Sequence, residues 1–93
     1  MMPQSARDVI AALTRKGFVE RGGDHRFFIL FIDGRKTRIS TKISRGDREI
    51  HDRNLGLMAR QMELAGPEFR RLIDCSMSGE DYASLMRDRG KAE

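Results

Sequence analysis

The sequence predicts an α+β fold, in which helices are segregated from a small antiparallel sheet. Apolar residues recur at helical spacing near the N-terminus and again in the second half of the chain, whereas the stretch between them is rich in aromatic and β-branched residues. The dipeptide Asp33-Gly34 divides that stretch and is among the strongest signals for a β-hairpin. The chain has 93 residues, which is enough for one small domain with one core.

The first helix is expected to begin near Ser5, because Ser5 and Asp8 together resemble a capping box. Gly17 is expected to end it. A short strand from Phe18 to Glu20 follows, and the pair Gly22-Gly23 then indicates a tight turn. The N-terminal part of the chain is therefore predicted to form a helix, a strand and a turn.

Two further strands are expected on either side of Asp33-Gly34, from His25 to Ile32 and from Arg35 to Ile43. A two-residue loop pairs Ile32 with Arg35, so odd positions of the first strand lie opposite even positions of the second. The predicted core face consists of Phe28, Leu30, Ile32, Thr37, Ile39, Thr41 and Ile43. The opposite face combines aromatic, aliphatic, polar and basic residues: His25, Phe27, Ile29, Phe31, Lys36, Arg38, Ser40 and Lys42.

The second half of the chain is predicted to be helical. After a polar loop from Ser44 to Ile50, Asp52 is expected to cap a helix that ends at Gly66-Pro67, where a short helix begins. A capping box from Ser78 to Asp81 opens a last helix, which Gly90 closes. The predicted order is therefore α-β-β-β-α, followed by two short helices.

Positive charge is concentrated in the front portion of the chain. Residues 1–60 contain 13 Lys+Arg against 7 Asp+Glu, whereas residues 61–93 contain 5 against 7. Seven of the cations fall between Arg35 and Arg53, on or just after the return strand of the hairpin. A stripe of this kind suits a polyanion such as nucleic acid, although a solvated face with an excess of arginine has the same composition.

The aromatic and basic face of the predicted sheet suits single-stranded RNA, because rings can stack bases while cations pair with phosphates. An alternative is that the two C-terminal helices cover Phe27, Ile29 and Phe31. His25 and His51 are the only imidazoles, and the carboxylates near them alternate with arginines, so no metal site and no cofactor are expected. No apolar run approaches the roughly 18 residues of a membrane span, so a cytoplasmic protein is expected.

Three short motifs occur in a distinctive order. The tripeptide K-G-F occupies residues 16–18, R-G-G-D-H-R-F-F occupies 21–28 ahead of a basic return strand, and N-L-G-L-M occupies 54–58. Together they resemble the HicA (YcfA-like) family of toxins over the stretch from Asp8 to Gly66. The core motif of the family maps onto Gly23, Asp24, His25 and Phe28.

The resemblance implies a fold similar to that of a double-stranded-RNA-binding domain. Residues 1–66 would form the HicA-like core of a single domain, and residues 67–93 a helical extension that compact family members lack. It also implies a ribosome-independent mRNA endoribonuclease that a HicB-type antitoxin holds inactive. His25 is the catalytic residue in this interpretation, and the RNA-binding residues are Phe27, Lys36, Arg38, Lys42 and Arg45.

The implied chemistry suits these residue types. RNA can be cleaved without a metal ion if a base that titrates near neutral pH helps the 2′-hydroxyl attack its own phosphate, and histidine is such a base. Lys36, Arg38 or Lys42 could stabilise the charge that develops on the phosphate. Two alternatives remain: a non-catalytic RNA-binding module of the same fold, and a protein-interaction domain that uses the sheet face. Residues 67–93 could shield the active face, form a homodimer, or replace part of the antitoxin.

Overall fold

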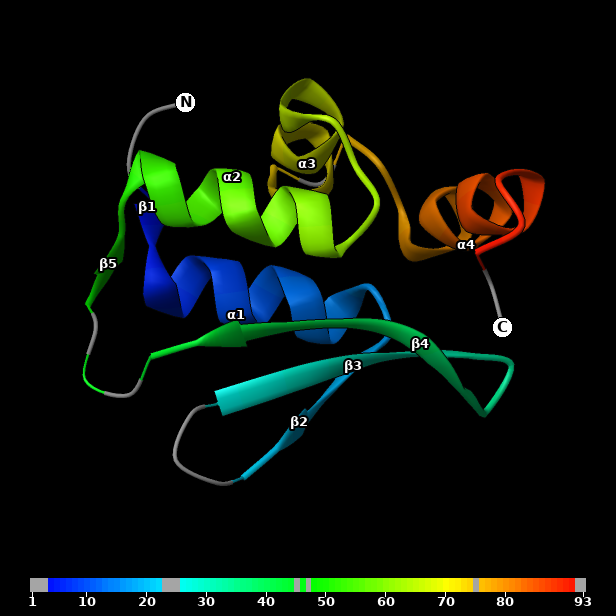
Figure 1. Cartoon of the computed structure of the whole chain (residues 1–93), viewed down its shortest axis with the longest axis horizontal. Helices are drawn as coiled ribbons and strands as arrows, with labels where there is room; N and C mark the ends of the chain where they lie inside the picture. The colour runs from blue at the N-terminus through cyan, green and yellow to red at the C-terminus, as the bar shows by residue number, and fades with distance from the viewer. Residues whose placement is uncertain (1–3, 23–25, 45, 47, 75, 92–93) are drawn as a thin grey trace.

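The computed structural model describes residues 4–22, 26–44, 46, 48–74 and 76–91. Its elements are β1 (Gln4–Ser5), α1 (Ala6–Arg15), β2 (Phe18–Arg21), β3 (Arg26–Ile32), β4 (Arg35–Ile43), β5 (Glu49–Ile50), α2 (Asp52–Gln61), α3 (Gly66–Ile73) and α4 (Gly79–Asp88). The three strands β2, β3 and β4 form an antiparallel sheet in that order, and β1 pairs with β5. All four helices lie on one side of the three-stranded sheet (Figure 1). The predicted α+β class is confirmed.

The ends of α1 follow the sequence signals. The Ser5 hydroxyl accepts a hydrogen bond from the Asp8 amide at 3.4 Å, which satisfies one of the amides at the start of the helix. Gly17, with φ of 101°, turns the chain into β2, and its carbonyl accepts a hydrogen bond from the Phe31 amide at 2.9 Å. A Cβ atom at Gly17 would lie 3.1 Å from the Phe31 carbonyl oxygen, so glycine is required both by φ and by space.

The hairpin between β3 and β4 has the predicted two-residue loop. Asp33 and Gly34 have φ of 54° and 78°, as a type I′ turn requires, and Ile32 pairs with Arg35. Between the pairs Phe31↔Lys36 and Ile29↔Ser40 the register shifts, because residues 37–39 of β4 lie opposite a single residue of β3. The shift equals two residues, so the alternation of faces resumes beyond this bulge.

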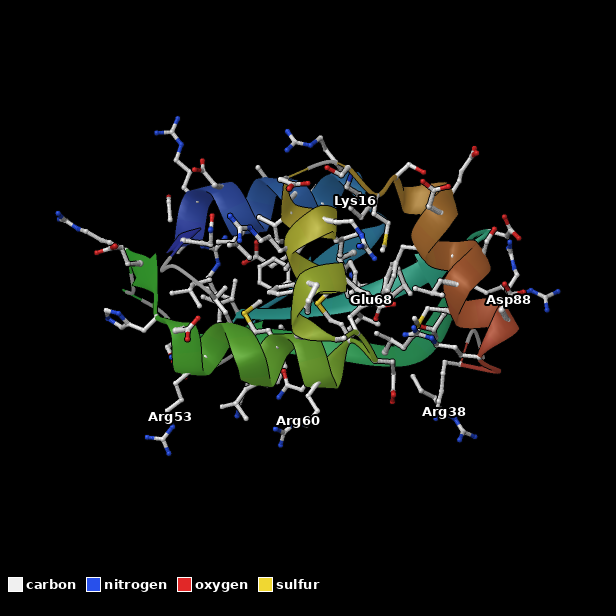
Figure 2. The ribbon with its side chains drawn as sticks, turned by 90° about the horizontal axis from the view of Figure 1, so that it is seen from above. Lys16, Arg38, Arg53, Arg60, Glu68 and Asp88 are labelled. Carbon is white, nitrogen blue, oxygen red and sulfur yellow. The ribbon has the colours of Figure 1, made fainter. Side chains whose placement is uncertain are left out.

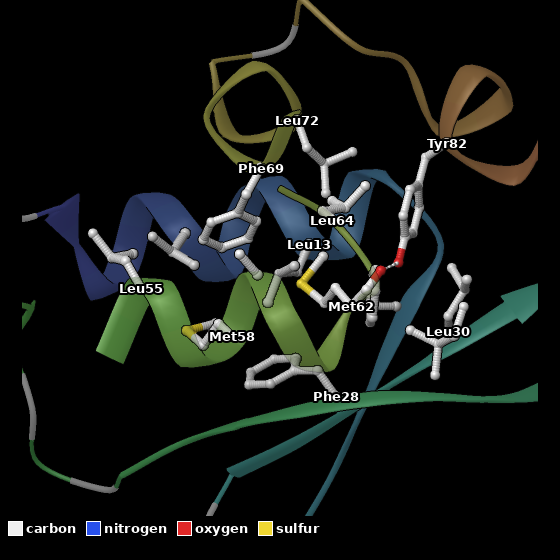
Figure 3. Close-up of a cluster of buried hydrophobic side chains, with 14 of the residues drawn as sticks. Leu13, Phe28, Leu30, Leu55, Met58, Met62, Leu64, Phe69, Leu72 and Tyr82 are labelled. Atoms are coloured by element: carbon white, nitrogen blue, oxygen red, sulfur yellow. Dashed lines mark hydrogen bonds between the residues drawn. The ribbon is translucent and has the colours of Figure 1, made fainter. Parts of the chain in front are cut away.

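The core occupies the space between the sheet and the helices (Figure 3). Phe28 and Leu30 project from β3 into a cluster that also contains Leu13, Leu55, Met62, Phe69, Leu72, Tyr82 and Met86. The Tyr82 ring stacks on Phe18 with centroids 6.0 Å apart, and its hydroxyl donates to the Met62 carbonyl at 2.8 Å. Residues from α3 and α4 therefore belong to the same core as the sheet and the first two helices.

Helix α2 differs from its prediction at both ends. His51, not Asp52, is the N-cap, and no side chain caps the helix in the described residues. The helix ends at Gln61 rather than at Gly66, because Glu63 adopts φ of 61° and reverses the chain. Gly66 and Pro67 open α3, as predicted, and the Glu68 carboxylate accepts a hydrogen bond from the Ala65 amide at 2.8 Å. The loop before α2 contains β5, which the sequence did not predict.

The last helix agrees with its prediction. Ser78 and Asp81 form both hydrogen bonds of a capping box, at 3.0 and 3.2 Å, and Gly90, with φ of 71°, follows the C-terminus of α4. Within the described ranges, no helix is both long enough and apolar enough to span a membrane.

Candidate nucleic-acid interface

The side of the sheet that faces away from the helices carries the candidate interface, here called the open face. Strand residues two apart point to the same side and directly paired residues share a face, so the positions that alternate with Phe28 and Leu30 and their partners make up this face. Its members are Val19, Arg21, Phe27, Ile29, Phe31, Lys36, Ser40 and Lys42. No helix of the described chain lies on this side of the sheet in Figure 1. The predicted division of β3 and β4 into two faces is thereby confirmed for the described residues except Arg38, which lies in the bulge of β4.

The C-terminal helices do not cover the open face. Four of their large residues, Phe69, Leu72, Tyr82 and Met86, are fully buried in the core cluster that contains Phe28, on the other side of the sheet. Phe27 and Val19 remain 39% and 38% exposed. The alternative in which α3 and α4 cover the aromatic face is therefore wrong.

One row of the open face places an aromatic ring between two cations. Phe27 in β3 pairs with Arg21 in β2 on one side and with Lys42 in β4 on the other. Neighbouring strands are separated by about 4.8 Å, so the backbones of both basic residues lie close enough for their side chains to reach a ligand that contacts the ring. An exposed ring with flanking cations can stack on a base and hold its phosphates.

A second aromatic group lies further along β3. The Arg21 guanidinium carbon lies 5.8 Å from the centroid of the Phe31 ring, within the range of a cation–π contact. Lys36 pairs with Phe31 across the hairpin. Positions 27 and 31 are four residues apart, which corresponds to about 13 Å along a strand. The open face thus offers two aromatic positions, each accompanied by cations.

The electrostatics of the open face are uniformly positive. Its described members include three cations and no Asp or Glu. Two nearby carboxylates are engaged by arginines: Glu20 accepts two hydrogen bonds from Arg26, both at 2.7 Å, and Asp33 accepts one from Arg87 at 2.6 Å. The bond with Glu20 raises the pKa of the Arg26 guanidinium. The approach of a phosphate to the open face meets no opposing charge from that face.

Arg38 occupies the bulge of β4 and differs from Lys36 and Lys42. It lines a shallow hollow with Gln61 and Lys91, at the end of α2. Figure 2 shows Arg38, Arg53 and Arg60 extending from the same side of the molecule. Arg38 is exposed, but it projects from the edge of the sheet rather than from the centre of the open face.

The structure brings part of the predicted site together. Phe27, Lys36 and Lys42 share the open face, and Phe28 lies in the core at 0% exposed, directly behind it. The predicted catalytic residue His25, its neighbours Gly23 and Asp24, and the predicted RNA-binding residue Arg45 lie outside the described residues.

Sequence reasoning missed Arg21. Its parity with Val19 places it on the outer side of β2, but the pairing of β2 with β3 depends on the loop between them. The only signal in the sequence was that Arg21 follows the apolar residue Val19 by two positions. The pairing Arg21↔Phe27 makes it a member of the interface.

Comparison of the chain with protein-family models, with curated proteins and with solved structures gave no match. Among the described residues, no group of three or more His, Cys, Asp or Glu side chains could hold a metal ion. The chemistry of the open face is thus that of rings and fixed cations, which suits the binding of a flexible polyanion.

Proposed function

We propose that this chain is a HicA-like RNA-binding protein, that it cleaves mRNA without a metal ion, and that a HicB-like antitoxin holds it inactive in the cytoplasm. One observation carries the proposal: no described helix covers the open face of the sheet. The described residues of that face include Phe27, Phe31 and three cations, and none of them is a carboxylate. A surface built only to stay in solution needs no exposed aromatic row.

The arrangement of the elements supports a fold similar to a double-stranded-RNA-binding domain. The order α1-β2-β3-β4-α2, with both helices packed on one side of an antiparallel sheet, is the arrangement that the HicA resemblance implies. The chain adds α3 and α4 to the helical side, which leaves the opposite side of the sheet for RNA.

The catalytic part of the proposal rests on His25. In the sequence it directly precedes Arg26, the first residue of β3, and the next residue of that strand, Phe27, pairs with Lys42. In the proposed reaction, His25 takes the proton from a 2′-hydroxyl, whose oxygen then bonds to the adjacent phosphorus while the 5′-oxygen of the next nucleotide leaves. Lys42, opposite Phe27, stabilises the additional negative charge on the phosphate oxygens, and Lys36, opposite Phe31, binds a phosphate further along the RNA.

Two histidine variants test catalysis. His25→Ala is expected to retain RNA binding and lose cleavage of a mixed mRNA substrate, together with any toxicity on expression. His51→Ala is the matched control, because it removes the other imidazole from an exposed position next to α2 and is expected to cleave like the unaltered protein. Both variants are measured in chelator-containing buffer for RNA affinity, cleavage and melting temperature.

The outcomes separate binding from catalysis. Equal cleavage by His25→Ala and by the unaltered protein would refute the assignment of His25. Binding without cleavage by any form would leave a non-catalytic RNA-binding module of the same fold. Phe27→Ala tests the interface itself: loss of one exposed stacking ring is expected to weaken RNA affinity by about 1 to 3 kcal/mol. Unchanged affinity in Phe27→Ala would remove the open face from the proposal.

A further inference from the structure

The outer edge of β4 is a second surface, on the side of the sheet where α2 lies. β4 is nine residues long and is the last strand of the sheet, with β3 as its only neighbour in the described chain. An edge strand carries alternating N–H and C=O groups that can pair with a further strand. The regular part of this edge beyond the bulge, residues 40–43, is therefore a template for an added strand.

A pocket lies along this edge, where β4 meets α2. Its walls include Lys42 and Ile43 from β4, Ile50 from β5, and Asn54, Leu57 and Met58 from α2, and it encloses about 100 Å³. We call this surface the edge groove. A water molecule takes about 30 Å³ in the liquid, so the pocket has room for one aliphatic side chain. Leu57 is 48% exposed, more than any other large apolar residue described.

The edge groove is held in shape by a contact between its two walls. The Thr41 hydroxyl of β4 donates a hydrogen bond of 2.7 Å to the side-chain oxygen of Gln61 in α2. Met58 and Ile43, at the floor of the pocket, are 3% and 4% exposed and belong to the core. A partner would meet a surface that is already formed, which lowers the entropy cost of binding.

The charge around the edge groove has one sign along its length. The described cations at or beside it are Lys42, which lines the pocket, and Arg38, Arg53 and Arg60, which project from the same side of the molecule. Arg53 and Arg60 flank Leu57 on α2 and project in the same direction as Arg38 (Figure 2). Among the described residues, the carboxylates nearest in the sequence to those that line the pocket are Glu49, Asp52 and Glu63.

We propose that the edge groove binds an extended, acidic segment of a protein partner, which adds a strand to β4 and places one apolar side chain against Leu57. Backbone pairing would supply affinity, the pocket would select the apolar residue, and the cations would select acidic neighbours. The inference gives a position and a chemistry to the protein partner of the proposed function and rests on that part of it, but not on RNA cleavage.

Two other occupants fit the surface less well. A second copy of the chain would place the cations of one β4 against those of the other, which is unfavourable for strands directly paired. RNA would satisfy the cations, but it would leave the exposed apolar surface of Leu57 and the unpaired strand edge without a matching partner. An acidic strand matches all three features.

Selection from a displayed library of random peptides, each as long as β4, tests the inference with the full chain as bait. The expected selected peptides have net negative charge and at least one apolar residue flanked by Asp or Glu. A selected peptide, made synthetically, is then titrated against the unaltered protein and against Leu57→Asp, Leu57→Gln and Phe27→Ala. The two Leu57 variants are expected to bind at least about tenfold more weakly, because both remove the apolar anchor. Leu57→Gln keeps a good helix-forming residue, so its loss of binding is not attributable to unfolding of α2.

The same variants distinguish this inference from the RNA proposal. Phe27→Ala is expected to bind the peptide normally while it loses affinity for a single-stranded oligoribonucleotide, and Leu57→Gln is expected to show the reverse. The inference is overturned if selection yields no peptides or yields neutral or basic ones, or if Leu57→Gln binds the peptide like the unaltered protein. A loss of RNA affinity in Leu57→Gln would show that RNA occupies the edge groove. If the unaltered protein sediments as a dimer and Leu57→Gln as a monomer, the occupant is a second copy of the chain. Either result would also overturn the inference.

Discussion

The two faces of the sheet use the same strands for opposite purposes. Phe28 is 0% exposed in a core to which all four helices contribute, whereas Phe27, its neighbour in β3, is 39% exposed and pairs with Arg21 and Lys42. Both residues satisfy the preference of a strand for aromatic side chains. Their environments differ only because strand residues alternate between faces and because every helix packs on one side. Position relative to the helices, not residue type, therefore separates the residues that hold the fold from those available for binding.

The largest effect is expected from removing α3 and α4, which help to bury the core face of the sheet. A chain ending at Gly66 loses Phe69, Leu72, Tyr82 and Met86, all fully buried. Loss of a buried residue of this size costs about 2 to 5 kcal/mol, so the four together cost about 8 to 20 kcal/mol, which is as large as the roughly 5 to 15 kcal/mol that stabilises a typical domain. We expect no cooperative thermal transition by circular dichroism. A chain lacking only residues 92–93 is the control, and an unchanged melting temperature for the short chain would make α3 and α4 an appendage.

A matched pair of alanine variants measures the difference between the faces directly. Phe28→Ala is expected to lower the free energy of unfolding by about 3 to 5 kcal/mol, because it leaves a cavity in the core. Phe27→Ala is expected to cost less than about 1 kcal/mol. Urea denaturation of both variants checks the pair. Similar costs for the two would show that the open face is covered in solution.

Tyr82 gives a pH-dependent test of the core face. Burial raises the pKa of its hydroxyl above the usual value of 10.0. Below about pH 10 the hydroxyl is neutral in both states, but above it the unfolded chain loses the proton and the folded chain does not, so stability falls as pH rises. Tyr82→Phe should therefore lose less stability than the unaltered protein between about pH 9 and pH 11.

At neutral pH the same variant should be less stable by about 1 to 2 kcal/mol, because the Met62 carbonyl loses the hydrogen bond that Tyr82 donates at 2.8 Å. Denaturant titrations at several pH values give both quantities. An identical alkaline decline in the two proteins would place the Tyr82 hydroxyl in water.

The smallest effect on stability is expected from the cations of the open face. Lys36→Ala and Lys42→Ala should each change the free energy of unfolding by less than about 0.5 kcal/mol, since both side chains are exposed. Each variant should also bind RNA more weakly. The slope of log affinity against log salt concentration should become shallower by about 1, which corresponds to one lost phosphate contact. Lys91→Ala, which removes an exposed cation outside the open face, is the control. A salt dependence that none of the variants alters would separate these lysines from RNA.

The sequence predicted the features that depend on neighbours in the chain. Asp33-Gly34 specified a two-residue turn, and this turn fixed the faces of β3 and β4 outside the bulge at residues 37–39. The caps at Ser5 and Ser78 were equally local, because each hydrogen bond joins residues three apart. Local rules therefore sufficed for Phe27, Lys36 and Lys42.

Features that depend on distant parts of the chain were not predictable in this way. The pairing of Gln4 with Ile50 joins segments that no sequence pattern connects. The position of Arg21 opposite Phe27 needs the geometry of a loop, and Arg38 moved to the edge because Thr37 forms a bulge, in which its hydroxyl donates to the Leu30 carbonyl at 2.8 Å. Because α3 and α4 pack on the same side of the sheet as α1 and α2, the aromatic residues of the opposite face stay exposed. The amphipathic patterns of α3 and α4 did not predict which side of the sheet they would cover.

The stacking of Tyr82 on Phe18 also determines when the protein can fold during its synthesis. The two rings, 6.0 Å apart in space, come from the last helix and the first strand of the central sheet. Contacts so far apart in sequence form late, and domains fold as units while the chain emerges from the ribosome. The core therefore closes only after residues 79–88 have been made. Until then Phe18, Leu30 and Met62 lack one wall of their packing, and the growing chain exposes the surface that its final helix will bury.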